Sequence, residues 1–320
     1  MEFKHIPVLL DEVIEGLNIN PNGIYVDCTV GGAGHSTEIC KRLKNGRLLG
    51  LDRDPDAVAV AKKRLENYNA KVFNANYDRI SEILALENIE KVDGILMDLG
   101  VSSYQLDNPE RGFSYNDEDA PLDMRMSKSG MSAADFLNTA PEDEISKILY
   151  VYGEEKYSRS IAKKIVEIRK ISSFKTTGDF EKAIREAVPA KYIRQKNPCK
   201  KSFQAVRIYI NDEFVHLENG LEECFKSLKT CGRLCVISFH SLEDRIVRHK
   251  FSEWQRGCIC PPDFPVCVCG RKPMGKVLSK SGIKADDAEI SENRRSRSAI
   301  LRIIERSGEK YRTPDENKAR

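Results

Sequence analysis

A glycine-rich loop followed by a distant acidic residue is the first pattern in this chain with a chemical meaning. The apolar run Gly23–Cys28 leads into Gly31-Gly-Ala-Gly34, where small residues let the backbone approach a ligand closely. A second apolar run ends at Asp52, eighteen residues after Gly34, where a carboxylate can accept hydrogen bonds from ribose hydroxyls. This combination predicts a site for a nucleotide-type cofactor.

Two cofactor classes share this plan, and one glycine separates them. A dinucleotide-binding loop has the form G-x-G-x-x-G, in which the last glycine packs the helix against the strand. Here Gly32 and Gly34 are followed by His35-Ser-Thr37, so that last glycine is missing. Asp27 with its two following glycines is closer to the pattern of S-adenosylmethionine (SAM) sites. We therefore predict SAM, with a nicotinamide-dependent oxidoreductase as the alternative.

Polar residues at the ends of two further apolar runs predict a reaction centre. Asp98 ends the run 92–98, and His240 follows the run 232–239. In open α/β sheets, ligands bind at the carboxyl ends of the strands. Asp98 can accept hydrogen bonds from the amino group of a base, or hold the amino group of the cofactor. His240 can accept a proton or position the base. The alternative for both is ordinary loop and cap chemistry, with His240 as a structural histidine.

The elements that must position these residues follow from hydropathy. The four apolar runs are continuous and lie helix-length segments apart, which is typical of parallel strands buried on both faces. Asp54-Pro55 predicts the start of a helix over 54–67, as an N-cap followed by proline at the first helical position. This order predicts an α/β fold with an open, Rossmann-like sheet.

The stretch from about residue 105 to 200 differs, because it contains no strand pattern. Composition and caps predict helices over 132–138, 141–151, 157–170 and 177–187. After it, apolar residues from Phe203 to Leu228 recur at spacings of three and four, which predicts one amphipathic helix over 202–228. The predicted layout is a core of residues 1–105 and 201–306, a helical insertion over 106–200, and a polar tail over 307–320.

Length, composition and charge exclude several classes of protein. The 320 residues are 40% hydrophobic and 32% charged with a net charge of +3, and no apolar run approaches the roughly 20 residues of a membrane helix. The first residues lack a signal-peptide pattern, so we expect a cytoplasmic protein with reduced cysteines. The small net charge hides −8 over residues 102–155 and +10 over residues 156–201. The basic stretch predicts either a phosphate-contacting surface or solvated helical faces.

Four of the ten cysteines lie close together in the sequence. The segment 258–269 contains Cys258, Cys260, Cys267 and Cys269, with prolines between the two pairs. Four thiolates can complete a tetrahedral zinc site, although the C-x-C spacing is less common than C-x₂-C. A reduced thiol hairpin and a redox-active pair are the alternatives. Any metal in this segment would be structural.

Longer motifs, in order along the chain, resemble one family. The resemblance covers residues 4 to about 306. It is carried by His5-Ile-Pro-Val-Leu-Leu-Asp-Glu12, Leu51-Asp-Arg-Asp-Pro55, Asp98-Leu-Gly-Val-Ser-Ser103, Arg111-Gly-Phe-Ser114, Pro121-Leu-Asp-Met-Arg-Met126, Phe203-Gln-Ala-Val-Arg207, Ile237-Ser-Phe-His-Ser-Leu-Glu-Asp-Arg245 and Arg295-Ser-Arg-Ser298. These motifs are similar to those of the bacterial methyltransferase H family, which methylates N4 of a decoding-region cytidine in 16S ribosomal RNA.

The resemblance implies a class I SAM-dependent methyltransferase core interrupted by a helical domain that recognises the RNA substrate. It implies that the main role of Asp98 is to bind the cofactor. It also implies that Asp52 contacts the ribose and that Tyr77 lies near the adenine. The further implied SAM contacts are Ala33, Gly34, His35 and Gln105.

The same resemblance implies a partner, 16S rRNA in the small ribosomal subunit. A target base must leave its stack to be methylated, and Phe136 is the candidate platform for the flipped cytosine. Candidate phosphate contacts are Arg111, Arg125, Lys200 and Lys201. The apolar seam of 202–228 could serve a homodimer as well as a core. A non-catalytic ribosome-assembly factor is a further alternative, supported by the charge segregation alone.

Overall fold

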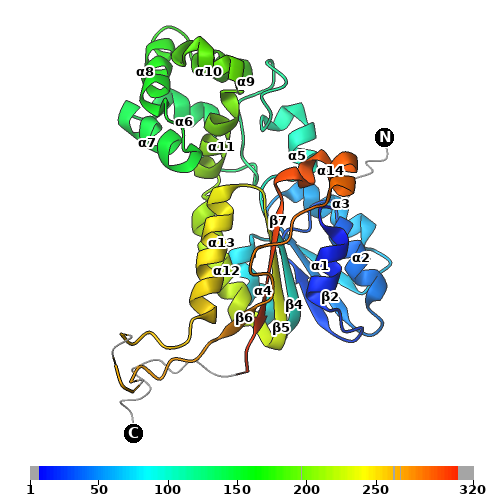
Figure 1. The fold of residues 1–320 in the computed structure, drawn as a ribbon. Helices are drawn as coiled ribbons and strands as arrows, with labels where there is room; N and C mark the ends of the chain where they lie inside the picture. Colours follow the sequence, from blue (N-terminus) through cyan, green and yellow to red (C-terminus); the bar gives the residue numbers. More distant parts are fainter. Residues whose placement is uncertain (1–6, 196, 262–263, 267, 309–320) are drawn as a thin grey trace. The chain divides into compact units, whose positions relative to one another are not determined.

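The computed structural model describes residues 7–195, 197–261, 264–266 and 268–308, and it divides the chain into two compact units (Figure 1). Residues 1–100 and 216–320 form the first, called here the sheet unit, and residues 101–215 form the second, the helical unit. The helical unit therefore interrupts the sheet unit in the sequence. The predicted polar tail lies outside the described residues from position 309 onward.

A seven-stranded sheet in the order β3-β2-β1-β4-β5-β7-β6 is the frame of the sheet unit. Neighbouring strands from β3 to β5 are parallel, whereas β7 runs antiparallel to both β5 and β6. The strands are β1 Ile24–Asp27, β2 Arg47–Asp52, β3 Ala70–Asn74, β4 Val92–Asp98, β5 Leu228–Ser238, β6 Gly275–Val277 and β7 Ile300–Arg306. This is the Rossmann-like class I methyltransferase architecture, so the predicted fold class is confirmed.

Alternating side chains of the strands enter two separate cores, one on each face of the sheet. Tyr25 and Leu96 pack in a core with α1, α2 and α3, whereas Val26 and Ile95 pack in the other with α4, α12 and α13. The helices and turns of this unit are α1 Leu10–Leu17, α2 Gly34–Arg42, α3 Pro55–Arg64, η1 Tyr77–Arg79, α4 Ile80–Leu86, α12 Glu213–Ser227, α13 Ser241–Gln255, α14 Asp287–Glu292 and η3 Arg294–Ser298. Burial on both faces explains the continuous apolar runs of the sequence.

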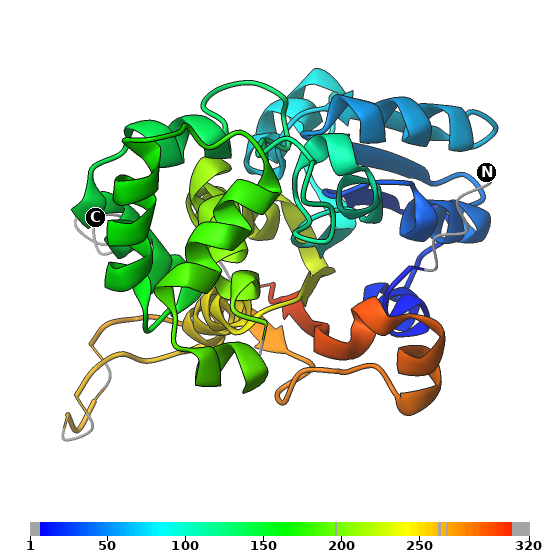
Figure 2. The same ribbon diagram turned by 90° about the horizontal axis from the view of Figure 1, so that it is seen from above.

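The helical unit has a hydrophobic core of its own. Figure 2 shows its helices in a second view. Its elements are α5 Ser103–Asp107, η2 Pro109–Arg111, α6 Ala133–Thr139, α7 Glu142–Gly153, α8 Ser158–Arg169, α9 Thr177–Ala187, α10 Ala190–Gln195 and α11 Cys199–Ile210. Capping boxes begin α6 at Ser132 and α9 at Thr176, which satisfies the first free amides of both helices. The four predicted helices of this stretch correspond to α6, α7, α8 and α9.

The predicted single helix over 202–228 is wrong, because the chain breaks between α11 and α12. Asp212 has a left-handed backbone with φ 48°, and the side-chain amide of Asn211 donates to the Met124 carbonyl at 2.7 Å. The apolar seam is therefore divided. Phe203 packs in the core of the helical unit, and Leu217 packs in the core of the sheet unit. Because these two cores bury the seam, it gives no support to a homodimer.

Strand prediction succeeded for four of the seven strands, and all four are buried on both faces. The four predicted strands correspond to β1, β2, β4 and β5, whereas β3, β6 and β7 were missed. β3 is an edge strand of mixed burial, and β6 is only three residues long, so neither carries a long apolar run. Among the described residues, no helix combines the length and apolar character needed to cross a membrane.

Candidate cofactor site

Three aspartates end three neighbouring strands of the sheet unit. Asp27, Asp52 and Asp98 are the last residues of β1, β2 and β4, and β1 lies between the other two in the parallel sheet. Parallel strands bring their carboxyl ends to one edge, where ligands of open α/β sheets bind. Each carboxyl group has a raised pKa with burial as the first cause: about 6 for Asp27, about 6 for Asp52 and about 8 for Asp98.

Asp27 organises the loop after β1. Its Oδ2 accepts from the Ser36 hydroxyl at 2.6 Å, and its Oδ1 accepts from the Thr29 amide at 3.1 Å. The Thr29 hydroxyl in turn accepts from the Asp98 amide at 2.6 Å. Asp27 is 1% exposed, so its role is to hold the loop rather than to contact a ligand. Sequence reasoning did not include Asp27 among the site residues, although it stands at the head of the glycine motif.

The glycine loop is tied to the end of β2. The Gly31 amide donates to Asp52 Oδ2 at 2.9 Å, and the Asp54 amide donates to Asp52 Oδ1 at 2.8 Å. A carboxylate has about four acceptor positions, so Asp52 can hold this turn and still accept from ribose hydroxyls. The predicted ribose contact is compatible with this geometry and stays a prediction.

Two glycines of the loop have different roles. A Cβ on Gly34 would lie 2.6 Å from the Pro7 side chain, so close packing of the N-terminal segment requires glycine there. A Cβ on Gly32 would meet only the end of the Arg64 side chain, at 3.8 Å, so the backbone of Gly32 faces open space. Ala33 begins α2 with a left-handed φ of 59° and is buried. The accessible backbone of this loop is therefore at Gly32.

Asp98 carries an unsatisfied oxygen at the centre of this edge. Its buried Oδ1 has no hydrogen-bond partner among the described residues, and its side chain is 22% exposed. Burial raises its pKa most, and repulsion from Asp27 and Glu243 adds to the shift. A buried acceptor without a partner is costly, and a cationic or hydrogen-bond-donating ligand would relieve that cost.

His35 lies beside Asp98 and is held in its neutral form. Its Nε2 contacts the Val8 carbonyl at 2.9 Å, so this nitrogen carries the proton and donates. Burial lowers the pKa of His35 to about 4, and the contact with Val8 only partly opposes the shift. Its Nδ1 lies 3.8 Å from Asp98 Oδ2. The site therefore contains acidic groups and a neutral imidazole, which fits the sulfonium and ammonium groups of SAM.

Tyr77 and His240 have structural contacts that the sequence did not reveal. The half-buried Tyr77 ring packs on α12 at Gly220, where a Cβ would overlap it. His240 is the N-cap of α13: its Nδ1 accepts from the Glu243 amide at 3.3 Å. These contacts favour the structural interpretation of His240.

Glu243 is the residue of this edge that sequence reasoning missed. It is 2% exposed, and its Oε2 accepts from the Phe239 amide at 2.9 Å. The loop after β5 is thereby closed onto α13. The signal was present in the sequence, because an acid three residues after an N-cap is the mark of a capping box.

Three of the six site candidates in the helical unit are Gln105, Arg111 and Arg125, and their side chains are buried or paired. Gln105 is 4% exposed and completes the capping box of α5 with Ser102. Arg111 is 6% exposed, and its Nη2 donates to the carbonyls of Arg125 and Met126. Arg125 forms a bidentate pair with Asp123. The prediction that Arg111 contacts phosphate is therefore corrected, because its guanidinium fastens the chain internally.

Phe136 is also corrected. Its side chain is 1% exposed, and its ring lies 4.6 Å from that of Tyr209 in the core of the helical unit. A platform for a flipped base needs a free ring face. The sequence could not distinguish a core phenylalanine from such a platform.

The exposed bases of the helical unit are concentrated in its basic stretch. Lys200 and Lys201 are exposed, and Lys201 also donates to the Glu154 carbonyl at 2.8 Å. Lys156 lies over the rings of Tyr157 and Tyr192. Further exposed bases are Arg159, Lys163, Lys170, Lys175, Lys182, Arg185, Lys191 and Arg194.

Three of the four predicted metal-ligating cysteines come together. The sulfur atoms of Cys258, Cys260 and Cys269 all lie within 4.8 Å of one another in the loop between α13 and β6. Cys267 lies outside the described residues. The aspartates of the sheet edge are not part of this group.

Comparison with known proteins gives consistent similarities over nearly the whole chain. Residues 2–307 match the model of the MraW methylase family. The chain is 51% identical over 306 residues to ribosomal RNA small subunit methyltransferase H of Clostridium botulinum, covering 95% of this chain and 99% of that protein. It is 48% identical over 313 residues to ribosomal RNA small subunit methyltransferase H 2 of Agathobacter rectalis, covering 96% and 99%. Among solved structures, an rRNA methylase from Streptococcus thermophilus aligns with a TM-score of 0.40 and 10% identity, covering 93% of each chain.

Proposed function

The chain belongs to the MraW methylase family, and we propose that it is a SAM-dependent methyltransferase that modifies the exocyclic N4 of a decoding-region cytidine in 16S rRNA. The single observation that carries the cofactor assignment is the unsatisfied, buried Oδ1 of Asp98 beside a neutral His35. An oxidoreductase and a non-catalytic assembly factor are not favoured, because the family is one of methylases.

Different residues of the sheet edge contact different parts of the cofactor. Asp98 holds the ammonium of the methionine part, because it offers the acceptor that lacks a partner. Asp52 accepts from the ribose hydroxyls, and the open backbone at Gly32 lets the cofactor lie close to the loop. His35 is kept neutral by burial, so it does not repel a cationic cofactor. Tyr77 flanks the adenine.

The chemistry requires alignment and the removal of one proton. SAM supplies an electrophilic methyl group, and its transfer to N4 leaves a neutral thioether and releases one proton from the amino group. The N4 lone pair is delocalised into the cytosine ring, so the protein must orient the amino group and exclude water. His240 contributes by capping α13, which fixes the loop after β5 at this edge. Methyl transfer from a sulfonium needs no metal, so any ion in the cysteine loop has a structural role.

The basic stretch of the helical unit binds the RNA backbone. Lys200 and Lys201 lie in the first turn of α11, and both are exposed. Flexible lysines on a surface contact phosphates without reading the sequence. The selection of one cytidine therefore comes from RNA shape and from the pocket that receives the base, within the small subunit in the cytoplasm.

The test is a methyl-transfer assay with labelled SAM and small subunits from a strain that lacks the gene, followed by mass-spectrometric mapping. We expect label on one cytidine, as N4-methylcytidine, and no transfer by Asp98→Asn. Asp11→Asn, which changes an exposed acid of α1 in the same way, should transfer at the normal rate. SAM binding without transfer to any cytidine would favour another acceptor. Binding of a nicotinamide cofactor in place of SAM would overturn the proposal.

A further inference from the structure

We propose that Cys258, Cys260 and Cys269 form a structural site for a thiophilic divalent metal ion, with zinc as the expected occupant. The three sulfurs lie in the loop between α13 and β6 and within 4.8 Å of one another. This site is separate from the carboxylate edge at which the cofactor is proposed to bind. It goes beyond the proposed methyl transfer, which needs no metal.

The separation of the sulfurs fits coordination to one ion. Zinc–thiolate bonds are about 2.3 Å long, and a tetrahedral angle then places two sulfurs about 3.8 Å apart. The Sγ atoms of Cys258 and Cys269 are 3.7 Å apart, although the residues are eleven positions apart in the sequence. The loop therefore already holds the sulfurs of Cys258 and Cys269 at the distance that a shared ion requires.

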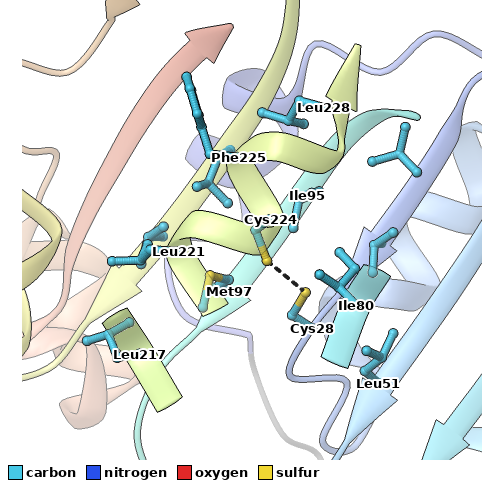
Figure 3. Close-up of a cluster of buried hydrophobic side chains, with 14 of the residues drawn as sticks. Cys28, Leu51, Ile80, Ile95, Met97, Leu217, Leu221, Cys224, Phe225 and Leu228 are labelled. Atoms are coloured by element: carbon cyan, nitrogen blue, oxygen red, sulfur yellow. Dashed lines mark hydrogen bonds between the residues drawn. The ribbon is translucent and has the colours of Figure 1, made fainter. Parts of the chain in front are cut away.

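A sulfur–sulfur distance alone does not make a metal site, as a second pair in this protein demonstrates. Cys28 and Cys224 also have their Sγ atoms 3.7 Å apart, but they lie in the hydrophobic core under the sheet (Figure 3). Burial raises the pKa of Cys28 well above its usual range, and no third sulfur, histidine or carboxylate joins the pair in a ligand group among the described residues. The loop cysteines differ because there are three of them and they are accessible to solvent.

Backbone amides already point at two of the loop sulfurs. The Ile259 amide donates to Cys269 Sγ at 3.5 Å, and the Cys260 amide donates to Cys258 Sγ at 3.4 Å. These contacts hold the two sulfurs in place within the loop. Fixed sulfur positions lower the cost of arranging the ligands around an ion.

The loop also needs a cross-link, because the apolar side chains in its described part are exposed. Ile259, Phe264, Val266 and Val268 are 47%, 51%, 70% and 74% exposed. A segment that buries so little apolar surface gains little stability from packing, and small domains of this kind are commonly held by metals. Three thiolates around a divalent ion carry one net negative charge, and the bases Arg256, Arg271 and Lys272 flank the cysteines in the sequence. Thiolate ligands select zinc over magnesium or calcium.

The experiment uses the full chain, purified with reductant and without chelator. Elemental analysis should find close to one zinc ion per chain in the wild type and in Cys231→Ser, which changes an exposed cysteine outside the group. Cys260→Ser and Cys269→Ser should each lower the zinc content at least tenfold after dialysis. Equal zinc content in these variants and the wild type would place the ion elsewhere and overturn the proposal.

A second measurement covers variants that fold poorly. Chelated, reduced wild-type protein is titrated with cobalt(II), and thiolate-to-cobalt charge-transfer bands should saturate at one equivalent. A protein that contains no metal and develops no such bands contradicts the site. So does isolation of a Cys258–Cys269 disulfide under conditions that preserve thiols elsewhere. Unchanged SAM affinity in Cys260→Ser would show that failure of the metal site leaves the cofactor proposal intact.

Discussion

Asp98 Oδ2 and His35 Nδ1 face each other at 3.8 Å, and burial moves their pKa values in opposite directions. The pKa of Asp98 rises to about 8 and that of His35 falls to about 4, so both groups are mostly uncharged at neutral pH before a ligand binds. The pair is thus not an ion pair. When a cation binds beside Asp98, the carboxyl group of Asp98 must release its proton. Cofactor binding is therefore coupled to pH.

SAM affinity should therefore rise with pH between about 6 and 7.5. Below a pKa of about 8, Asp98 must lose a proton to bind an ammonium, so the affinity falls up to tenfold per pH unit. Calorimetry in two buffers of different ionisation enthalpy should detect release of close to one proton. In Asp98→Asn, which cannot ionise, the affinity should be weaker and independent of pH. Equal slopes in both proteins would rule out this coupling.

The stability of the cofactor-free protein should change in the opposite direction. The carboxyl group of Asp98 binds its proton more tightly in the folded than in the unfolded chain, so its contribution to stability declines as pH rises through about 8. The decline is at most about 1.4 kcal/mol per pH unit. Above pH 6, Asp27 and Asp52 contribute less to the pH dependence of stability. In that range Asp98→Asn should remove the loss of stability that accompanies rising pH. Thermal melts at pH 6 and pH 8 test this expectation. The melting temperature of the variant should rise relative to that of the wild type at pH 8 but not at pH 6.

Substitutions of Gly34 and Gly32 should distinguish a packing role from a role in the close approach of the cofactor. Gly34→Ala should destabilise the fold by about 1–3 kcal/mol, because the added methyl group would overlap Pro7. Gly32→Ala should leave the melting temperature nearly unchanged and weaken SAM binding, because the methyl group enters the space over the loop. Melting curves and SAM titrations of both variants check this. A stable Gly34→Ala protein would contradict the packing argument.

Replacement of His240 tests whether it acts as a cap or as a proton acceptor. His240→Ala should cost about 0.5–2 kcal/mol of stability, because α13 loses its side-chain acceptor. His240→Asn offers another good cap and should restore both stability and turnover. Chemical denaturation and single-turnover methyl transfer are the measurements. If His240→Asn is stable but its transfer rate falls by two orders of magnitude or more, the imidazole acts in the chemistry.

Removal of charge at the start of α11 should weaken RNA binding uniformly. Lys200→Gln with Lys201→Gln should lower the affinity for small-subunit RNA and flatten its dependence on salt by about 1–2 units of log–log slope. Lys147→Gln changes an exposed lysine of the acidic stretch and should alter neither quantity. Binding titrations at several salt concentrations suffice. A loss of affinity with an unchanged slope would point to misfolding rather than to lost phosphate contacts.

The sequence predicted the parts of this protein whose signals are local. The glycine loop, the strand-terminal aspartates and the caps of α3, α6 and α9 follow from neighbouring residues, and the structure contains all of them. The fold class followed because strands buried on both faces must be apolar throughout. Strands β3 and β6 gave no such signal, because one lies at an edge and the other is very short.

Tertiary structure alone decided what depends on residues far apart in the chain. An apolar period is the same whether a helix continues or breaks, so only the left-handed Asp212 reveals that 202–228 serves two cores. Phe136 and Arg111 have the right chemistry for RNA, but packing inside the helical unit buries both. The charge states of Asp98 and His35 also arise only on folding. A pKa is set by burial and by neighbours in space, and the sequence records neither.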